Sequence, residues 1–256
     1  MFSDHFAFPL HALVNFVGGG GKTALIGRLM EEYHSQGTVL CTTTTRIHPP
    51  EAGEGSAVLA SDNIPLLRMM VEAIVRNCSG RFYMLTVTRY YLSPTLLRGV
   101  PEDFCSSFNR DSFSILLNEA DGAAGYSIKM PREGEPLLME NAQYLVPVIG
   151  IDCLNKKLGP EVLFRWQGFI SRNPHRNGEC ITPEVAAEIL MHPEGVCKGW
   201  KPGMQIVPFI NKADSPVDDS AARDLAQAIF RNGSFPVHRV VYGSVLHGRV
   251  DSITLS

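Results

Sequence analysis

The sequence predicts an α/β protein with a mainly parallel sheet and helices on both faces. Apolar runs with the length of buried strands alternate with segments of helical period along the chain. A glycine run separates the first apolar run from the first helical segment, and polar clusters follow several later runs. Because ligands of such folds bind beyond the carboxyl ends of the strands, we expect one shared site there.

The predicted elements follow one another with short connections. Strands are predicted at residues 11–17, 38–42, 82–87, 112–117, 144–149, 205–210 and 237–242. Helices are predicted at residues 23–35, 66–75, 183–191 and 221–230, the third with Thr182 as its N-cap before Pro183. The Pro-, Gly- and Glu-rich residues 130–136 are expected to form an exposed loop. No repeat or long linker divides the chain, so residues 1–256 are predicted to form a single domain.

Composition and charge exclude several classes of protein. A net charge of −3 gives no broad nucleic-acid-binding surface. No apolar run approaches the roughly 18–20 residues of a membrane span, and the N-terminus has no basic region typical of a secretory signal. The six cysteines show no C-x-x-C spacing, which suits a reducing compartment. We therefore expect a cytoplasmic protein without nucleic-acid or membrane partners.

The glycine run ends in Lys-Thr at a strand-to-helix junction, which is typical of a phosphate-binding loop. The loop comprises Gly18, Gly19, Gly20, Gly21, Lys22 and Thr23. Glycines let several N–H groups point into one nest, and the helix N-terminus adds partial positive charge. We expect an exposed Lys22 head to reach phosphates and the Thr23 hydroxyl to ligate Mg²⁺. This predicts a three-layer P-loop NTPase-like fold, and the alternative is a flexible Gly-rich turn.

The loop departs from the full Walker A pattern. Phe16 stands where that pattern has its first glycine, six residues before the lysine. The remaining Gly-x-x-Gly-Lys-Thr resembles the shortened loop of Mur ligases. A small-molecule kinase or Mur-like ligase that uses ATP is therefore the alternative function.

Two carboxylates follow the predicted strand at 112–117. Glu119 and Asp121 are two residues apart, so on an extended segment they point to the same side. This resembles a Walker B element, with Asp121 as the Mg²⁺ ligand and Glu119 assigned to catalysis, although Glu119 is also a candidate ligand. The alternative is an acidic turn after a buried strand.

A threonine run followed by arginine ends the predicted strand at 38–42. The hydroxyls of Thr42–Thr45 are candidates for contacting Mg²⁺ or the γ-phosphate, and Arg46 is a candidate for stabilising charge on a transferring phosphoryl group. With Lys22 and Glu119, Arg46 completes the predicted catalytic set. The alternative is that the threonines only favour the strand and that Arg46 lies on the surface.

An Asn-Lys-x-Asp segment follows the predicted strand at 205–210. Asn211, Lys212 and Asp214 match the motif by which guanine-nucleotide-binding proteins select their base. An aspartate there accepts hydrogen bonds from the guanine N1–H and exocyclic amine, which adenine cannot supply. This predicts GTP rather than ATP. The alternative is a helix N-terminus, with Asp214 or Ser215 as cap before Pro216.

The order of these motifs resembles the YqeC family over residues 14–250. The matching segments are Phe16–Thr23, Thr43–Ile47, Glu119–Ala123, Ile149–Asp152, Asn211–Asp214 and Gly243–Ser244. Ala24 and Ala124 depart from the family pattern, which often has Thr and Lys at these positions, whereas Lys129 before Pro131 agrees with it. The resemblance implies that Lys129 reaches the substrate or phosphates. It also implies an accessory role for selenium-dependent molybdenum hydroxylases.

Together, the residues and the resemblance predict a Mg²⁺-dependent nucleotide-binding protein. We expect GTP, with ATP as the alternative, and an NTP hydrolase as the class of enzyme. The resemblance implies a molybdenum hydroxylase, or its maturation proteins, as the partner. A nucleotide-gated module that delivers a cofactor without modifying a small molecule fits the same motifs.

Overall fold

The computed structural model describes residues 1–47, 55–77, 83–93 and 96–255. The chain forms two compact units, which are described separately. The first unit comprises residues 1–15, 25–122 and 137–144, and the second comprises residues 16–24, 123–136 and 145–256. β1 (Ala12–Gly18) and α2 (Lys22–His34) each contribute residues to both units. Whether residues 1–256 act as a single domain stays a prediction.

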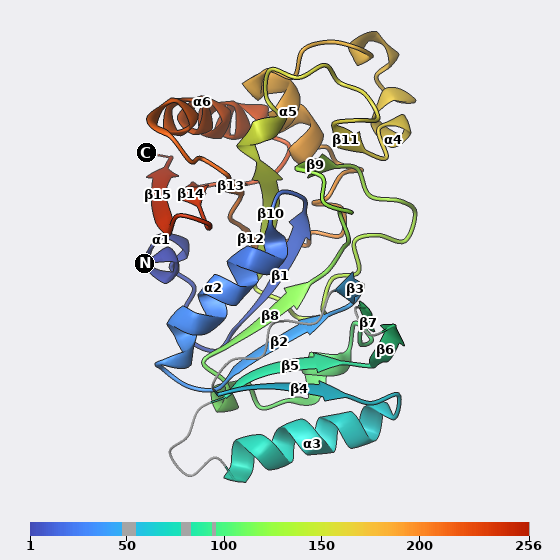
Figure 1. The fold of residues 1–256 in the computed structure, drawn as a ribbon, viewed down its shortest axis with the longest axis vertical. Coiled ribbons are helices and arrows are strands. Elements are labelled where there is room, and N and C mark those ends of the chain that lie inside the picture. The colour runs from blue at the N-terminus through green and yellow to red at the C-terminus, as the bar shows by residue number, and fades with distance from the viewer. Residues whose placement is uncertain (48–54, 78–82, 94–95, 256) are drawn as a thin grey trace. The chain divides into compact units, whose positions relative to one another are not determined.

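The first unit has a parallel sheet with strand order β8-β2-β5-β4 (Figure 1). Its strands are β2 (Val39–Thr43), β4 (Ser56–Ala60), β5 (Met84–Thr88) and β8 (Ile115–Glu119), and its other helices are α1 (Phe2–Phe6) and α3 (Ile64–Asn77). A small antiparallel sheet joins β3 (Arg46–Ile47), β7 (Leu96–Arg98) and β6 (Tyr90–Ser93). The core includes Leu40, Leu67, Leu85, Phe104 and Leu116. Apolar residues on both sheet faces explain why the strands are nearly continuous hydrophobic runs.

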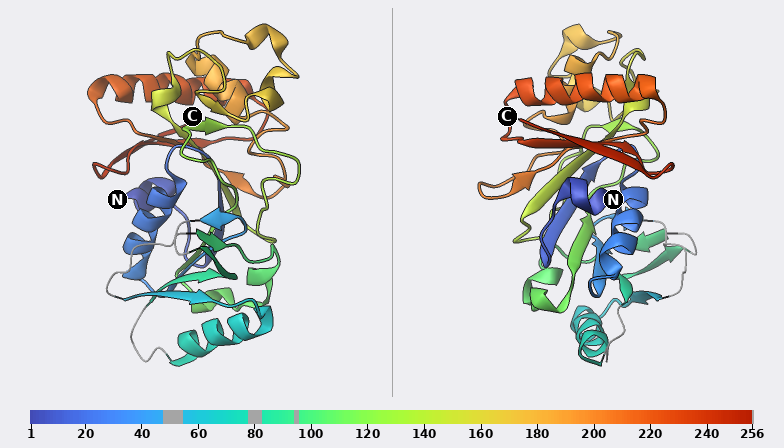
Figure 2. Two further views of the ribbon diagram at one scale, coloured as in Figure 1. Left: turned by 45° about the vertical axis from the view of Figure 1, so that its right-hand side comes forward. Right: turned by 90° about the vertical axis from the view of Figure 1, so that its left-hand side faces the viewer.

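The second unit has a sheet with strand order β15-β14-β13-β10. β10 (Tyr144–Gly150), β13 (Phe209–Asn211) and β14 (Arg239–Ser244) are parallel, and β15 (Arg249–Thr254) is antiparallel to β14. α6 (Pro216–Asn232) packs against β14 and α5 (Pro183–Leu190), and Figure 2 shows α6 running alongside the last two strands. The remaining elements are β9 (Ile128–Lys129), β11 (Leu163–Phe164), α4 (Gln167–Ile170) and β12 (Gln205–Ile206).

The predicted α/β class with mainly parallel strands is confirmed. The finer assignment, a three-layer P-loop NTPase-like fold with helices on both faces, stays a prediction. Thr182 is the N-cap of α5, accepting a hydrogen bond from Val185 N at 3.4 Å. α6 begins at Pro216, earlier than predicted, because Ser215 and Asp218 form a capping box before its apolar positions start.

Two local predictions were wrong. The strand predicted at 205–210 is split into β12 and β13, and Pro208 in the gap lacks the N–H that a continuous ladder needs. Residues 130–136 are not exposed throughout, because Met130 and Glu135 are buried. No helix among the described residues has the length and apolar character needed to cross a membrane.

Candidate functional site

The glycine loop connects β1 to α2 and adopts backbone angles that favour glycine. Gly18, Gly20 and Gly21 have φ angles of 94°, 79° and 114°. L-residues rarely adopt these angles, whereas glycine does so without steric cost. The run is therefore a defined turn that delivers the chain into α2 at Lys22.

Close packing also requires glycine in this loop. A Cβ on Gly19 would lie within 3.0 Å of Tyr126 O, and one on Gly20 within 3.0 Å of Gly150 N. A Cβ on Gly21 would lie equally close to Asn211 Nδ2. The loop thus lies directly against the segment at 126–128, the end of β10 and the end of β13.

Two amide groups of the loop already have protein acceptors. Gly19 N donates to Val148 O and Gly20 N donates to Tyr126 O, both at 2.9 Å. The first N–H groups of a helix have no partner within the helix. A phosphate at this loop would therefore be bound mainly by the first turn of α2, which starts at Lys22.

Lys22 does not have the exposed head that the sequence predicts. Lys22 is only 4% exposed, and its Nζ donates to Gly18 O at 2.5 Å. The flexible four-carbon stem folds back over the loop because the Gly18 carbonyl offers an acceptor one turn away. Thr23, by contrast, is exposed on the first turn of α2.

The Asn211 side chain joins the glycine loop to the turn after β14. Its Nδ2 donates to Gly20 O at 2.7 Å, and its Oδ1 accepts from Val245 N at 3.1 Å. Asn211 is only 6% exposed, so both hydrogen bonds are shielded from water. An amide can donate and accept at once, which a carboxylate cannot do.

Lys212 and Asp152 meet at Ser127, also within the second unit. Lys212 Nζ donates to Ser127 Oγ at 2.7 Å and to Asp152 Oδ2 at 3.1 Å. Burial alone would raise the pKa of Asp152, but hydrogen bonds with Ser127 and Lys212 outweigh this and lower it below its usual value. Lys212 has a φ of 65°, an uncommon conformation for a residue with a side chain.

Asp214 is exposed and is not the cap of α6. Ser215 is the N-cap, and its Oγ accepts from Asp218 N at 3.3 Å. The preceding turn is fixed by Arg249, whose Nη2 donates to Ala213 O at 3.0 Å. The capping alternative therefore applies to Ser215, and the Asp214 carboxylate stays available at the surface.

The two predicted Walker B-like carboxylates lie in the first unit. Asp121 is fully buried and Glu119 is 7% exposed, at the end of β8. The glycine loop belongs to the second unit, so joint Mg²⁺ binding by Thr23 and Asp121 stays a prediction. No group of three or more His, Cys, Asp or Glu suited to a metal occurs among the described residues. A hydroxyl and a carboxylate nevertheless fit Mg²⁺, which uses few protein oxygens and keeps several waters.

The hydroxyls of the threonine run donate to main-chain carbonyls of the first unit. Thr42 Oγ1 donates to Val87 O at 2.7 Å and Thr43 Oγ1 to Glu119 O at 2.8 Å, while Thr44 Oγ1 donates to Leu137 O. These contacts support the structural alternative for three of the four threonines. Arg46 lies exposed on β3, and its predicted catalytic role stays a prediction.

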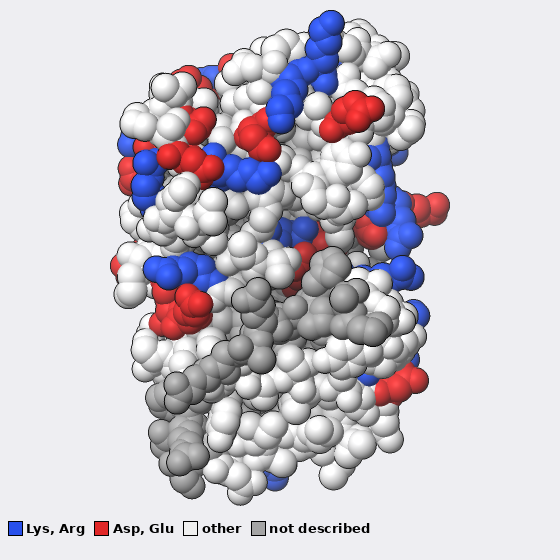
Figure 3. Space-filling model, viewed as in Figure 1, with Lys and Arg blue, Asp and Glu red and all other residues white. Residues whose placement is uncertain are grey.

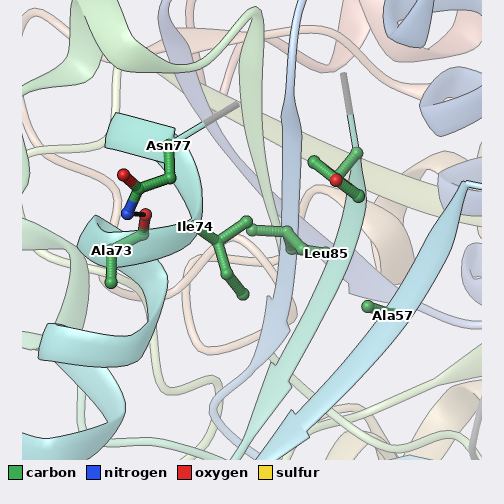
Figure 4. A pocket seen from close by; sticks show the side chains of 6 residues that line it. Ala57, Ala73, Ile74, Asn77 and Leu85 are labelled. Carbon is green, nitrogen blue, oxygen red and sulfur yellow. Dashed lines mark hydrogen bonds between the residues drawn. The ribbon is translucent and has the colours of Figure 1, made fainter. Parts of the chain in front are cut away.

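The first unit also has an apolar pocket that lies apart from the motif residues. The pocket lies between α3 and the β4–β5 edge and is lined by Ala57, Ala73, Ile74, Asn77, Tyr83 and Leu85 (Figure 4). None of the motif residues lines it. On the face drawn in Figure 3, basic and acidic side chains lie beside one another instead of forming one basic area.

Sequence reasoning missed the residues that support the glycine loop. Tyr126 and Ser127 contact Gly20 and Lys212 through a carbonyl and a hydroxyl. It also missed the ion pairs at Glu135, which joins Lys129 and Arg165. The only available signal was the Asp-Gly-Ala element just before Tyr126, since the pairing partners are far apart in sequence.

Comparisons with known proteins confirm the family resemblance. The family model described as YqeC protein matches residues 14–167. An Escherichia coli K12 protein named "Uncharacterized protein YqeC" is 26% identical over 218 residues, covering 85% of this chain and 82% of its own length. No solved structure matches the chain.

Proposed function

The chain belongs to the YqeC family, and we propose that it binds GTP with Mg²⁺ at the glycine loop of its second unit. The observation that carries this proposal is the Asn211 bridge. One buried amide joins the glycine loop at Gly20 to the turn at Val245, and places the Asn-Lys-Ala-Asp segment beside both. This contact within one unit supports the proposal that the loop binds the phosphates and the turn binds the base.

In this proposal the phosphates are bound by the start of α2. Helix N-terminal amides and the dipole attract anions, and Lys22 exchanges its contact with Gly18 O for phosphate oxygens. Bound Mg²⁺ neutralises phosphate charge, and Thr23 and Asp121 are the residues that would hold it. Glu119 and Arg46 are the proposed residues for orienting water and stabilising developing charge.

Base selection is assigned to Asp214. Its exposed carboxylate is not needed to cap α6, so it can accept hydrogen bonds from a guanine edge. Asn211 and Arg249 fix the turn on either side, which limits the entropy lost when a base binds. ATP lacks the matching donors and would leave the carboxylate poorly paired.

The biological role follows from the resemblance. We propose slow GTP hydrolysis that gates an accessory function in the maturation of a selenium-dependent molybdenum hydroxylase. The kinase or ligase alternative predicts transfer of labelled γ-phosphate to a metabolite. The gated accessory function predicts that hydrolysis is slow and is stimulated only when the partner protein is present.

Competition calorimetry with GTP, ATP and xanthosine triphosphate tests base selection. We expect GTP to bind roughly 30- to 1000-fold more tightly than ATP, because two hydrogen bonds, one to a charged acceptor, are worth about 2–4 kcal/mol. Asp214→Asn should weaken GTP binding and strengthen xanthosine triphosphate binding, since the xanthine carbonyl needs a donor.

Asp224→Asn is the matched control, because Asp224 is an exposed aspartate on α6 itself. It should leave all three affinities unchanged. If Asp214→Asn behaves like this control, Asp214 does not read the base. If neither GTP nor ATP binds the wild-type protein, the nucleotide proposal itself is wrong.

A further inference from the structure

A cluster of basic side chains surrounds Glu135 in the second unit. Arg132 Nε lies 3.0 Å from Glu135 Oε1, and Lys129 Nζ lies 3.4 Å from Oε2. Arg165 Nη1 also donates to Oε2. We propose that this cluster is a subsite for the carboxylate or phosphate group of a second, acidic ligand.

The arginines face outward while the carboxylate lies beneath them. The side chains of Arg132 and Arg165 are 69% and 29% exposed, whereas that of Glu135 is 7% exposed. Each contact with Glu135 uses one nitrogen of a guanidinium that carries five N–H donors. In the described parts of the chain, neither arginine pairs with another carboxylate. The solvent side of the cluster is therefore rich in donors and positive charge, despite the exposed Glu133 in the same loop.

The backbone conformation and aromatic contacts of Arg165 fix the position of its guanidinium. Its φ of 61° is uncommon for a residue with a side chain. Its guanidinium lies 4.7 Å from the centre of the Phe164 ring, and Phe164 packs against Tyr126 with ring centres 5.2 Å apart. A stacked guanidinium presents a fixed fork that matches a planar carboxylate or a phosphate. Little side-chain entropy is then lost on binding.

The cluster is built on a segment that contacts the glycine loop. Tyr126 O accepts the hydrogen bond from Gly20 N, and the chain continues from there into β9. β9 pairs with β11 in the register Lys129↔Phe164, which places Arg165 directly after the paired residue. A role as the site of a second substrate or effector rests on the proposed nucleotide function, whereas anion binding does not.

Calorimetry at low salt with phthalate, an aromatic dicarboxylate, tests the subsite. Arg165→Gln should weaken phthalate binding about tenfold or more, because a charge-assisted bidentate contact is lost. The phthalate affinity of Arg165→Lys should lie between those of the wild type and Arg165→Gln, because lysine keeps the charge but not the forked guanidinium. Arg132→Gln, at a largely exposed position, should weaken binding about threefold. Glu133→Gln is the matched loop control and should strengthen binding slightly.

Lys22→Gln separates this subsite from the glycine loop. This variant should weaken GTP binding at the loop and leave phthalate binding unchanged. Two results would overturn the subsite. One is loss of phthalate binding in Lys22→Gln, and the other is unchanged phthalate binding in both Arg132→Gln and a folded Arg165→Gln. If Arg165→Gln unfolds, Arg132→Gln decides. Phthalate binding through Arg132 or Arg165 in a protein that binds no GTP would leave the subsite standing and remove the nucleotide proposal.

Discussion

Two strand ends carry similar sequence patterns but use their polar groups differently. One is the turn that starts at the end of β13 in the second unit, and the other is the threonine run at the end of β2 in the first unit. Both begin at the carboxyl end of a buried parallel strand. Asn211 and Lys212 donate to distant loops, at Gly20 and Ser127. Thr42 and Thr43 instead donate to carbonyls of neighbouring strands, at Val87 and Glu119. The first pattern connects separate loops of the second unit, and the second stabilises its own sheet.

The difference follows from side-chain length and chemistry. A threonine hydroxyl sits close to its own backbone and bonds to nearby main-chain carbonyls, here those of Val87, Glu119 and Leu137. The longer amide and ammonium groups reach across a turn, and the amide can donate and accept together. A strand-end position thus predicts where polar side chains gather, while the reach of each side chain decides whether it serves the sheet or a site.

The largest effect is expected from breaking the glycine loop on which the Asn211 turn rests. Gly20→Ala should destabilise the protein by about 3 kcal/mol, because the φ of 79° costs roughly 1–2 kcal/mol and the new Cβ would overlap Gly150 N. Urea unfolding measures the change. Gly27→Ala in α2 is the control, since its Cβ would meet nothing within 4 Å and should add about 0.5–1 kcal/mol of stability. Equal stability of the two variants would contradict the packing of the loop.

A smaller effect is expected from removing the bridging side chain. Asn211→Ala should cost about 2 kcal/mol, because Gly20 O and Val245 N each lose a buried partner at a cost of about 1 kcal/mol. Asn211→Asp should cost about as much, because it keeps an acceptor for Val245 N but places a carboxylate oxygen with no proton to donate against Gly20 O. Both changes should weaken GTP binding.

Thr43→Val sharpens the comparison from the first unit. It should cost about 1–2 kcal/mol, because Thr45 N loses its acceptor Thr43 Oγ1, whereas Glu119 O keeps its hydrogen bond from Thr44 N at 3.2 Å. GTP affinity should stay unchanged if the hydroxyl serves only the sheet. A selective loss of GTP affinity in Thr43→Val would instead restore the interpretation of this run as a γ-phosphate contact.

The repeating pattern of the sequence was enough to predict most of the fold. The strand predicted at 144–149 and the helix predicted at 183–191 occur as β10 and α5 with small changes at their ends. Apolar runs and the Thr182-Pro183 cap are local signals, so they can be read without knowing distant partners. The antiparallel edge strand β15 was missed because its polar, exposed residues carry no such run.

The candidate site was only partly predictable, for a physical reason. The glycine loop and Asn211–Asp214 carry strong residue patterns. The contacts of Asn211 with Val245 and of Arg165 with Glu135 depend on how the second unit folds, and no local spacing encodes them. The exposure of Lys22 was predicted wrongly because a residue pattern does not show where a long side chain folds in the absence of ligand.

The smallest effect is expected at the exposed end of the Asn211 turn, where Lys212 meets Asp152. Their side chains are 37% and 43% exposed, so Lys212→Met should change stability by less than about 1 kcal/mol at neutral pH.

The pKa of Asp152 is lowered in the folded protein, so its ionised carboxylate contributes to stability above the unfolded pKa of about 3.9. This contribution is lost as pH falls through the lowered value. Lys212→Met should move the pKa of Asp152 upward and flatten this acid dependence. NMR titration of the Asp152 carboxyl and unfolding curves between acidic and neutral pH measure both. High salt should reduce the difference in Asp152 pKa between the wild type and Lys212→Met, because exposed charges are screened. An unchanged Asp152 pKa in Lys212→Met would show that Ser127 and Lys156 stabilise the carboxylate without Lys212. The turn would then be held by Asn211 without help from its neighbour.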